Sequence, residues 1–476
     1  MMAHWVAGWA AHQPDKPAII HDGGIITYRD LARRIERAAA ALAAAGIGRG
    51  DRVAQLGLNS PDTLVLLFAC ARVGAILVTL NWRLTPAELA VIAADCTPRA
   101  GWIDPEFAAA LPDLPRLASL DGEGDAPMAG REDDGVLLVY TSGTTGRPKG
   151  ALLTQRALTW NAINGLHAND LTAADRVLTA LPMFHVGGLN IQTTPALFAG
   201  ATVILERRFT PEGFCAALAA HRPSLTLLVP AVMQALLRHP DFTAADLSCL
   251  RLIMTGSSTV PAALIDPFHA RGIPVGQVYG STETGPTAIY LRADRAMAKV
   301  GSCGAPAPHV AVRVVDDQGR DVACGTAGEI LLRGPNLMAG YWNDAAATAA
   351  ALADGWYRTG DVGHRDADGC YWIDDRKKDV VISGGENIYP AELEAVLAAC
   401  PGIAEATVVG RPDPRWGEVP VAVVVSGLSE AEVLALFDGR LARYKHPRAV
   451  AFIDRLPRNV MGKVLKHEVR AWLGRP

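Results

Sequence analysis

The chain has no large excess of positive or negative charge, no closely spaced pair of cysteines and no long run of basic residues. Lys and Arg total 45 against 49 Asp and Glu, which gives a net charge of −4 and no basic run typical of a nucleic-acid surface. The eight cysteines include no CxxC pair and have no histidine at metal-ligand spacing, which argues against a disulfide framework and a zinc site. We therefore expect reduced thiols in a cytoplasmic protein that binds no nucleic acid.

Signals for export or for crossing a membrane are also missing. No Lys or Arg precedes the apolar residues at the N-terminus, and Asp15 and Lys16 follow soon afterwards, so we predict no cleaved signal peptide. The most apolar stretch, residues 64–80, is interrupted by Arg72 and Gly74. This pattern predicts a buried helix followed by a strand, and no transmembrane segment.

The length and the hydrophobic pattern predict an α/β protein of two domains. A chain of 476 residues exceeds the size at which one core stops growing. Short apolar runs alternate with helical patterns, which is typical of largely parallel sheets flanked by helices. Residues 301–341 predict a small β subdomain within a large N-terminal domain, residues 1–377, and residues 378–476 predict a small, mobile α+β domain.

Individual elements are predicted from the same patterns. The expected strands are residues 25–28, 53–56, 136–139, 176–182, 201–205, 225–229, 250–256, 275–279, 311–315, 328–333, 405–409 and 419–425. The expected helices are residues 30–45, 61–73, 391–399 and 429–441, and residues 121–134 are expected to form an exposed loop.

The stretch VLLVYTSGTTGRPKG, residues 136–150, changes abruptly from apolar residues to Gly, Ser and Thr. Converging backbone N–H groups, four hydroxyls and the cation of Lys149 are suited to holding phosphate. A Walker A loop is excluded because Arg147 and Pro148 separate Gly146 from Lys149, although a simple hairpin turn remains an alternative. The predicted phosphate ligands are Thr141, Ser142, Gly143, Thr144, Thr145 and Lys149.

TSGTTGRPKG resembles the phosphate loop of the adenylate-forming acyl-CoA synthetases, a family that also includes luciferases and the adenylation domains of peptide synthetases. Five motifs in family order extend the resemblance over essentially the whole chain. It implies an acid–thiol ligase that uses ATP, Mg²⁺ and CoA. The carboxylate of a small acid would attack the α-phosphorus of ATP and release pyrophosphate, and the CoA thiol would then displace AMP.

Further polar segments follow predicted strands, where the ligands of parallel sheets bind. In YGSTET, residues 279–284, the resemblance implies that Tyr279 packs against adenine, Thr282 donates to the α-phosphate and Glu283 holds Mg²⁺, whereas a polar surface turn is the alternative. Asp361 resembles the ribose-binding carboxylate, although it could be an ordinary turn residue. Gly256, Ser257 and Gly280 complete the predicted nucleotide site.

PMFHVGG, residues 182–188, resembles the family segment with a gate at the acyl pocket, although a hydrogen-bonded loop histidine is the alternative. It lacks the aspartate that holds the amino group in peptide-synthetase domains. Its apolar neighbours favour a medium-chain fatty or aryl monocarboxylate, and the missing basic residue argues weakly against malonate. The predicted acyl-pocket residues are His185, Val186, Gly187 and Gly188.

The C-terminal part carries the remaining predicted functions. In the charge run at residues 374–379, the resemblance implies that Arg376 contacts ribose and phosphate and that Lys378 is the hinge, whereas a solvated face is the alternative. Lys463 resembles the catalytic lysine, with Asn459 and Met461 where Ser or Thr is common. The residues that resemble CoA contacts are Arg83, Gly384, Gly385, Glu386, Trp416, Tyr444, Lys445 and Arg448.

Several alternatives remain open at this point. Arg83 could simply be a solvated arginine before a helix capped by Thr85. The acceptor could be the phosphopantetheine of a carrier protein, the enzyme could resemble malonyl-CoA synthetase, or the chain could be a non-catalytic nucleotide-binding relative. Retention of Glu283, Asp361 and Lys463 argues against the last alternative. A homodimer is compatible with the sequence.

Overall fold

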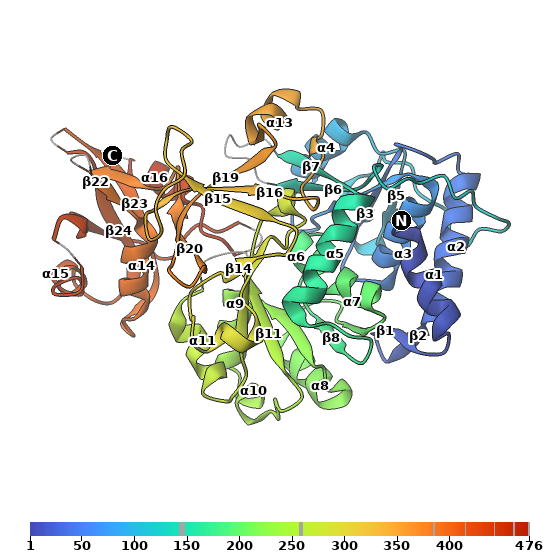
Figure 1. Cartoon of the computed structure of the whole chain (residues 1–476), viewed down its shortest axis with the longest axis horizontal. Coiled ribbons are helices and arrows are strands. Elements are labelled where there is room, and N and C mark those ends of the chain that lie inside the picture. Colours follow the sequence, from blue (N-terminus) through green and yellow to red (C-terminus); the bar gives the residue numbers. More distant parts are fainter. Residues whose placement is uncertain are drawn as a thin grey trace. The chain divides into compact units, whose positions relative to one another are not determined.

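A computed structural model describes residues 1–141, 148–256, 260–383, 386–414, 416–441, 443–459 and 462–474 (Figure 1). For residues 386, 387 and 444 it describes the backbone alone. The chain forms two compact units. The first comprises Met1–Ser257, Pro267–Val312 and Leu332–Tyr357, and the second comprises Ser258–Asp266, Arg313–Leu331 and Arg358–Pro476.

The larger sheet of the first unit has nine strands in the order β14-β13-β12-β11-β10-β8-β9-β1-β2. The strands from β12 to β1 are parallel, whereas β2, β13 and β14 are antiparallel to their neighbours. Parallel strands require both faces to be covered, which explains why their sequences are short continuous apolar runs. The bounds are β1 Pro17–His21, β2 Gly24–Thr27, β8 Arg176–Thr179, β9 Thr202–Leu205, β10 Leu225–Leu228, β11 Leu252–Gly256, β12 Val275–Tyr279, β13 Ile289–Tyr290 and β14 Ala305–Pro306.

The second sheet of this unit has six strands in the order β17-β7-β6-β4-β3-β5. Strands β6 and β7 are antiparallel, with Thr141 opposite Lys149, so the predicted phosphate loop joins the two strands of a hairpin. The loop residues Ser142, Gly143, Thr144 and Thr145 lie outside the described residues. The bounds are β3 Arg52–Leu56, β4 Ile76–Leu80, β5 Ala100–Ile103, β6 Gly135–Thr141, β7 Lys149–Thr154 and β17 Gly340–Tyr341.

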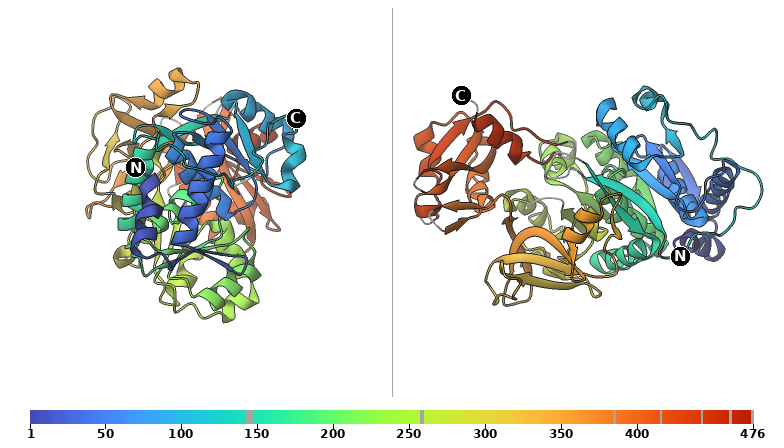
Figure 2. Two further views of the ribbon diagram at one scale, coloured as in Figure 1. Left: turned by 90° about the vertical axis from the view of Figure 1, so that its right-hand side faces the viewer. Right: turned by 90° about the horizontal axis from the view of Figure 1, so that it is seen from above.

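Helices pack against both sheets, as α3 does on β4 and α7 on β9 (Figures 1 and 2). Helix α3 begins after the capping hydroxyl of Ser60 and ends at Gly74, and β4 follows with every residue buried. This confirms the helix and strand predicted for residues 64–80. Among the described residues, no helix is both long and apolar enough to cross a bilayer. The helices are α1 Ala3–His12, α2 Tyr28–Ala44, α3 Pro61–Val73, α4 Pro86–Cys96, α5 Gln155–Asn169, α6 Val186–Asn190, α7 Thr193–Ala199, α8 Pro211–His221, α9 Pro230–Leu237, α10 Pro240–Ala244, α11 Ala262–His269, α12 Ala293–Ala296 and α13 Ala345–Ala351.

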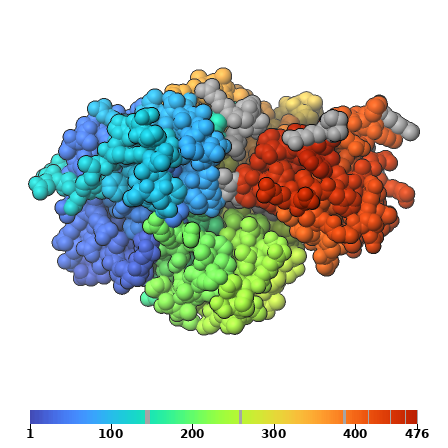
Figure 3. Space-filling model, turned by 180° about the vertical axis from the view of Figure 1, so that it is seen from behind, coloured from blue at the N-terminus to red at the C-terminus, as the bar shows by residue number. Residues whose placement is uncertain are grey.

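The C-terminal part of the second unit is a sheet of order β22-β21-β24-β23, with β25 paired to β24. Its buried core includes Leu393, Leu397, Val424 and Phe437, and its residues form one closely packed mass in the space-filling view (Figure 3). A separate sheet of order β15-β16-β19-β18, with β20 on β19, precedes it in sequence. The bounds are β15 Ala311–Val315, β16 Gly328–Arg333, β18 Leu352–Ala353, β19 Trp356–Arg365, β20 Tyr371–Arg376, β21 Val381–Ser383, β22 Glu386–Ile388, β23 Ile403–Asp413, β24 Gly417–Ser426, β25 Ala449–Phe452, α14 Pro390–Ala398, α15 Glu430–Ala435 and α16 Lys466–Leu473.

These elements confirm the predicted α/β class with largely parallel, helix-flanked sheets, but two local predictions are wrong. The helix expected over residues 429–441 is only α15, because the N–H groups of Leu436 and Phe437 bond to carbonyls three residues back and Gly439 has φ +70°. The predicted β subdomain does not extend to Tyr341, because β17 pairs with β7 and belongs to the six-stranded sheet.

Buried amides fix the turn that follows β12. The Asn161 side chain on α5 donates to the carbonyl of Asn190 at 2.7 Å and accepts from the N–H of Thr287 at 2.9 Å. Asn336 donates to the carbonyl of Thr284 at 2.6 Å. Both asparagines are fully buried, so these bonds hold the turn without competition from water.

We expect Asn161→Leu to destabilise the first unit. The substitution leaves the N–H of Thr287 and the carbonyl of Asn190 without their buried partner, and each unpaired group costs about 1–3 kcal/mol. The midpoint of urea unfolding, followed by tryptophan fluorescence, measures the loss. Gln234→Leu on the exposed side of α9 is the matched control, and an equal midpoint for the two variants would contradict the anchoring role.

Candidate active site

The turn that carries Glu283 is shaped by a glycine and a hydroxyl. A Cβ at Gly280 would lie 1.8 Å from the carbonyl oxygen of Pro286, so a larger residue does not fit there. Thr284 accepts from the N–H of Ser281 at 2.9 Å and closes a 3-10 turn over Thr282–Thr284. This turn places Thr282 and Glu283 just beyond the carboxyl end of β12, as the sequence predicted.

Glu283 is anchored by a tyrosine that the sequence analysis did not select. The hydroxyl of Tyr341 donates to Oε1 of Glu283 at 2.8 Å, and the carboxylate side chain is buried with 8% of the residue exposed. Burial, and then the charge and hydrogen bond of Glu283, raise the pKa of Tyr341, so its hydroxyl keeps the proton that it donates. The Nζ of Lys149 lies 5.2 Å from the centroid of the Tyr341 ring. Tyr341 therefore contacts two predicted functional residues.

This arrangement fits the predicted role of Glu283 toward Mg²⁺. Tyr341 occupies only Oε1, so the second carboxylate oxygen is available to a cation. Mg²⁺ usually takes one or two protein carboxylates, and phosphate and water oxygens complete its shell. When bound, the ion would neutralise phosphate charge.

Two other predicted nucleotide residues of this unit, Gly256 and Tyr279, end neighbouring strands. Gly256 ends β11 opposite Val278, and a Cβ at Gly256 would lie 2.6 Å from the Val278 carbonyl oxygen. Tyr279 ends β12 and is partly buried. Thr141 donates to the carbonyl of Lys149 at 3.3 Å, whereas Ser257 lies outside the described residues.

The predicted acyl-pocket residues lie together between β8 and α7. Nδ1 of His185 accepts from the N–H of Gly187 at 3.0 Å, which assigns the proton of a neutral ring to Nε2. Burial of the ring lowers the pKa of His185 to about 4, and the negative charge of Glu283 acts in the opposite direction. His185 is therefore uncharged at neutral pH. Gly188 is tightly enclosed, since a Cβ would lie 2.3 Å from the Pro182 carbonyl oxygen.

In the second unit, the predicted ribose ligand Asp361 pairs with Arg376. The two residues face each other on β19 and β20, with Nε of Arg376 at 2.6 Å from Oδ1 of Asp361, which is 7% exposed. The rest of the charge run is also ordered by specific contacts. Asp375 accepts from the N–H of Ala391 at 2.9 Å, and Asp379 pairs with Arg470 at 2.8 Å. The run is therefore not a simple solvated face.

Lys463 lies in a turn closed by Asn459, whose Oδ1 accepts the Lys463 N–H at 2.9 Å. An asparagine thus supplies the local acceptor at this position. Although Lys463 as a whole residue is exposed, burial around its ammonium lowers its pKa, and the positive charges of Arg376 and Lys378 lower it further. Asp361 and Asp379 act in the opposite direction. Lys463 is thus electrostatically coupled to Asp361, Arg376 and Lys378.

The predicted CoA residues fall into two separate groups. Arg448 lies 5.7 Å from the ring centroid of Trp416, which is 37% exposed, and Lys445 forms an ion pair with Glu392 at 2.8 Å. In the first unit, Arg83 lies 4.9 Å from the Trp82 ring centroid. Thr85 caps α4 as predicted. Gly384 and Gly385 lie outside the described residues, as do the side chains of Glu386 and Tyr444.

We expect opposite shifts in the pKa of Lys463 when its charged neighbours are neutralised. Arg376→Gln removes a positive charge and should raise the pKa of Lys463, whereas Asp361→Asn removes a negative charge and should lower it. The pH dependence of amine labelling at Lys463, followed by mass spectrometry against N-acetyl-lysine amide, measures both shifts. Shifts of the same sign in the two variants would contradict the electrostatic coupling of Lys463 to Arg376 and Asp361.

Comparisons with known proteins identify the family of this chain. The AMP-binding enzyme family model matches residues 6–342, and the AMP-binding enzyme C-terminal domain matches residues 392–463. An indoleacetate–CoA ligase of Aromatoleum aromaticum is 49% identical, with 100% of this chain and 98% of the relative covered, and a feruloyl-CoA synthase of Amycolatopsis sp. is 44% identical over 99% of each. O-succinylbenzoate coenzyme A synthetase from Bacillus subtilis, solved with ATP and a magnesium ion, has a TM-score of 0.88 and 32% identity over 98% of each chain. The chain belongs to the AMP-binding enzyme family, as an AMP-forming acid–thiol ligase of the acyl-CoA synthetase type.

Proposed function

We propose that this enzyme ligates an aryl monocarboxylate to CoA. The observation that carries the proposal is the acyl-pocket segment, in which an uncharged His185 is followed by the buried residues Val186, Gly187 and Gly188. Leu189 and Ile191 are buried as well, so the segment suits an apolar ring. The indoleacetate and feruloyl relatives, which match the full length of the chain, support an aryl acid over a medium-chain fatty acid.

A carboxylate is a poor acylating agent, so the reaction must first activate it. A carboxylate oxygen of the acid attacks the α-phosphorus of ATP and the bond to pyrophosphate breaks. The hydroxyl of Thr282 and the ammonium of Lys463 stabilise the added negative charge, and Glu283 would hold Mg²⁺, which would supply further positive charge.

The second half-reaction forms the thioester. The CoA sulfur attacks the acyl carbonyl carbon, the bond to the AMP oxygen breaks, and AMP leaves. Arg83, Trp416, Lys445 and Arg448 are the proposed CoA contacts among the residues with described side chains. The ribose hydroxyls bind Asp361 and Arg376. Lys378 is the proposed hinge at the boundary between residues 1–377 and a mobile domain at residues 378–476, so that the small domain presents Lys463 in the first step and the glycine segment at residues 384–385 in the second.

The thiols support a cytoplasmic location. All eight cysteines are free, and Cys70, Cys96, Cys303 and Cys370 are buried. Unpaired thiols are typical of proteins in a reducing compartment.

We expect pyrophosphate release to require Mg²⁺, ATP and an aryl acid together. Indole-3-acetate and ferulate should support faster exchange of labelled pyrophosphate into ATP than octanoate or malonate, because the pocket segment is apolar and has no cation for a second carboxylate. Thioester formation is then measured with CoA and with a phosphopantetheinyl carrier protein. Preference for octanoate, or for the carrier protein over CoA, would contradict the proposed substrates.

We expect two lysine variants to separate the half-reactions. Lys463→Ala should slow adenylation by roughly 10²–10³-fold and spare thioester formation from supplied acyl-adenylate. Lys378→Pro should show the reverse pattern, because proline fixes φ near −65° at the hinge. The Lys378 N–H makes no backbone hydrogen bond among the described residues, so the substitution removes no backbone hydrogen bond at this position.

The two half-reactions are followed separately by pyrophosphate exchange and by the release of AMP from supplied acyl-adenylate, and each variant serves as the control for the other. Wild-type thioester formation in Lys378→Pro would disprove the hinge, and equal loss of both steps in Lys463→Ala would assign Lys463 a structural role.

A further inference from the structure

A small enclosed cavity lies beside the acyl-pocket glycines. Gly187 and Gly188 line it together with three polar residues, Thr179 at the end of β8, Gln192, and Thr193 at the start of α7. The remaining walls are apolar and come from Leu178 on β8, Ala180 and Leu181 just after it, and Leu227 on β10. The cavity has about 10 Å³ of space, which is room for one water-sized group.

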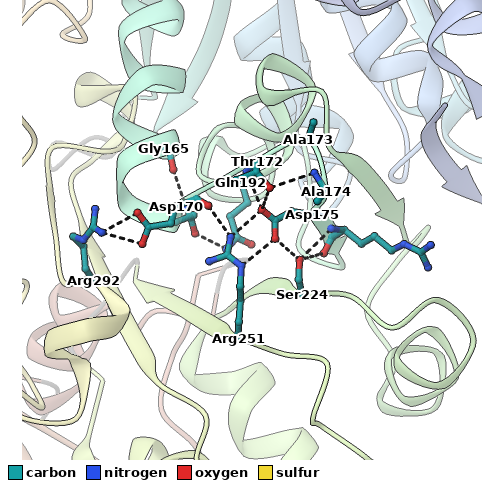
Figure 4. Close-up of polar contacts among 12 residues, drawn as sticks. Gly165, Asp170, Thr172, Ala173, Ala174, Asp175, Gln192, Ser224, Arg251 and Arg292 are labelled. Atoms are coloured by element: carbon teal, nitrogen blue, oxygen red, sulfur yellow. Dashed lines mark hydrogen bonds and ion pairs between the residues drawn. The ribbon is translucent and has the colours of Figure 1, made fainter. Parts of the chain in front are cut away.

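The amide orientation of Gln192 is fixed by its neighbours. Asn169 donates from Nδ2 to the carbonyl of Gly165 at 2.9 Å, so its Oδ1 must face the other way. That oxygen accepts from Nε2 of Gln192 at 2.8 Å. Gly165 and Gln192 are both labelled in the polar cluster of Figure 4. Oε1 of Gln192 therefore has a fixed role as an acceptor. It has no hydrogen-bond partner among the described residues, although Gln192 is only 2% exposed.

The hydroxyl protons of Thr179 and Thr193 are also engaged in hydrogen bonds. The hydroxyl of Thr193 donates to the carbonyl of Gly188 at 2.6 Å. Thr179 and Thr193 lie 2.7 Å apart between their Oγ1 atoms, and because the Thr193 proton is already engaged, Thr179 must be the donor in this pair. Oε1 of Gln192 and the hydroxyl oxygens of Thr179 and Thr193 thus retain acceptor capacity, beside one further N–H on Nε2 of Gln192.

We propose that this acceptor-rich cavity is the distal end of the acyl pocket, and that it binds an N–H or O–H group on the ring of the acid. This rests on the proposed aryl-acid function and specifies it further. A buried acceptor left unpaired is costly, so a ring with a donor at this position is preferred over the same ring without one. A second carboxylate is disfavoured, because it would leave the unpaired acceptor Oε1 of Gln192 without a donor.

The main rival occupant is a bound water. Water is also a donor of the right size, and it could satisfy both Gln192 and Thr179 without contacting the substrate. The two occupants differ in one consequence: only a substrate contact makes the rate depend on a donor in the acid.

The test compares indole-3-acetate with benzothiophene-3-acetate, in which sulfur replaces the ring N–H. In the wild-type enzyme, kcat/KM for pyrophosphate release should be about 10–100-fold higher for the indole acid. Gln192→Met keeps the length of the side chain and removes the acceptor. It should reduce this preference to less than about 5-fold, chiefly by lowering kcat/KM for the indole acid.

Each outcome is informative. Retained turnover of benzothiophene-3-acetate by Gln192→Met shows that the variant is folded, and Gln234→Met on the exposed side of α9 should keep the wild-type preference. Equal rates for the two acids in the wild type, or a preference that survives Gln192→Met, overturns the inference and leaves the aryl-acid function standing, with water as the occupant. Turnover of fatty acids alone overturns both.

Discussion

The hydrogen bond between Tyr341 and Glu283 is the contact on which the first unit's site depends. A buried carboxylate is costly unless it is hydrogen-bonded, and Tyr341 supplies that bond at 2.8 Å. Tyr341 lies on β17, which pairs with β7 immediately after the phosphate loop, while Glu283 follows β12 of the other sheet. One hydroxyl therefore ties the six-stranded sheet to the nine-stranded sheet where nucleotide chemistry is proposed.

Apolar patterns in the sequence made most of the helices and strands predictable. Helix α3 and strand β12 have the predicted bounds, because capping and apolar runs are local signals. Contacts made by distant residues were not predictable. Tyr341 is 58 residues from Glu283 and its sequence shows only a short strand-like segment. The acceptor role of Gln192 likewise depends on Asn169 and Gly165, and no local pattern indicates which way an amide faces.

The second unit shows how charges can be coupled without forming one ion-pair network. Asp361 and Arg376 form a direct ion pair. The charges of both residues, and those of Lys378 and Asp379, shift the pKa of Lys463. These residues span about a hundred positions of sequence, yet the turn closed by Asn459 and the pairing of β19 with β20 fix their backbones. The motifs identified the residue types. Their mutual influence requires the tertiary structure, because electrostatic coupling depends on distance and solvent access.

The β6–β7 hairpin has a consequence for how phosphate charge is met. In a strand–loop–helix phosphate site, the macrodipole of the following helix contributes a fixed partial charge that no single substitution removes. Here the segment after Thr141 leads into a strand, and strands carry only small net dipoles. At the proposed phosphate site, neutralisation of the triphosphate would therefore fall to discrete cations, bound Mg²⁺ and side chains such as Lys149, and evolution can exchange each such side chain individually.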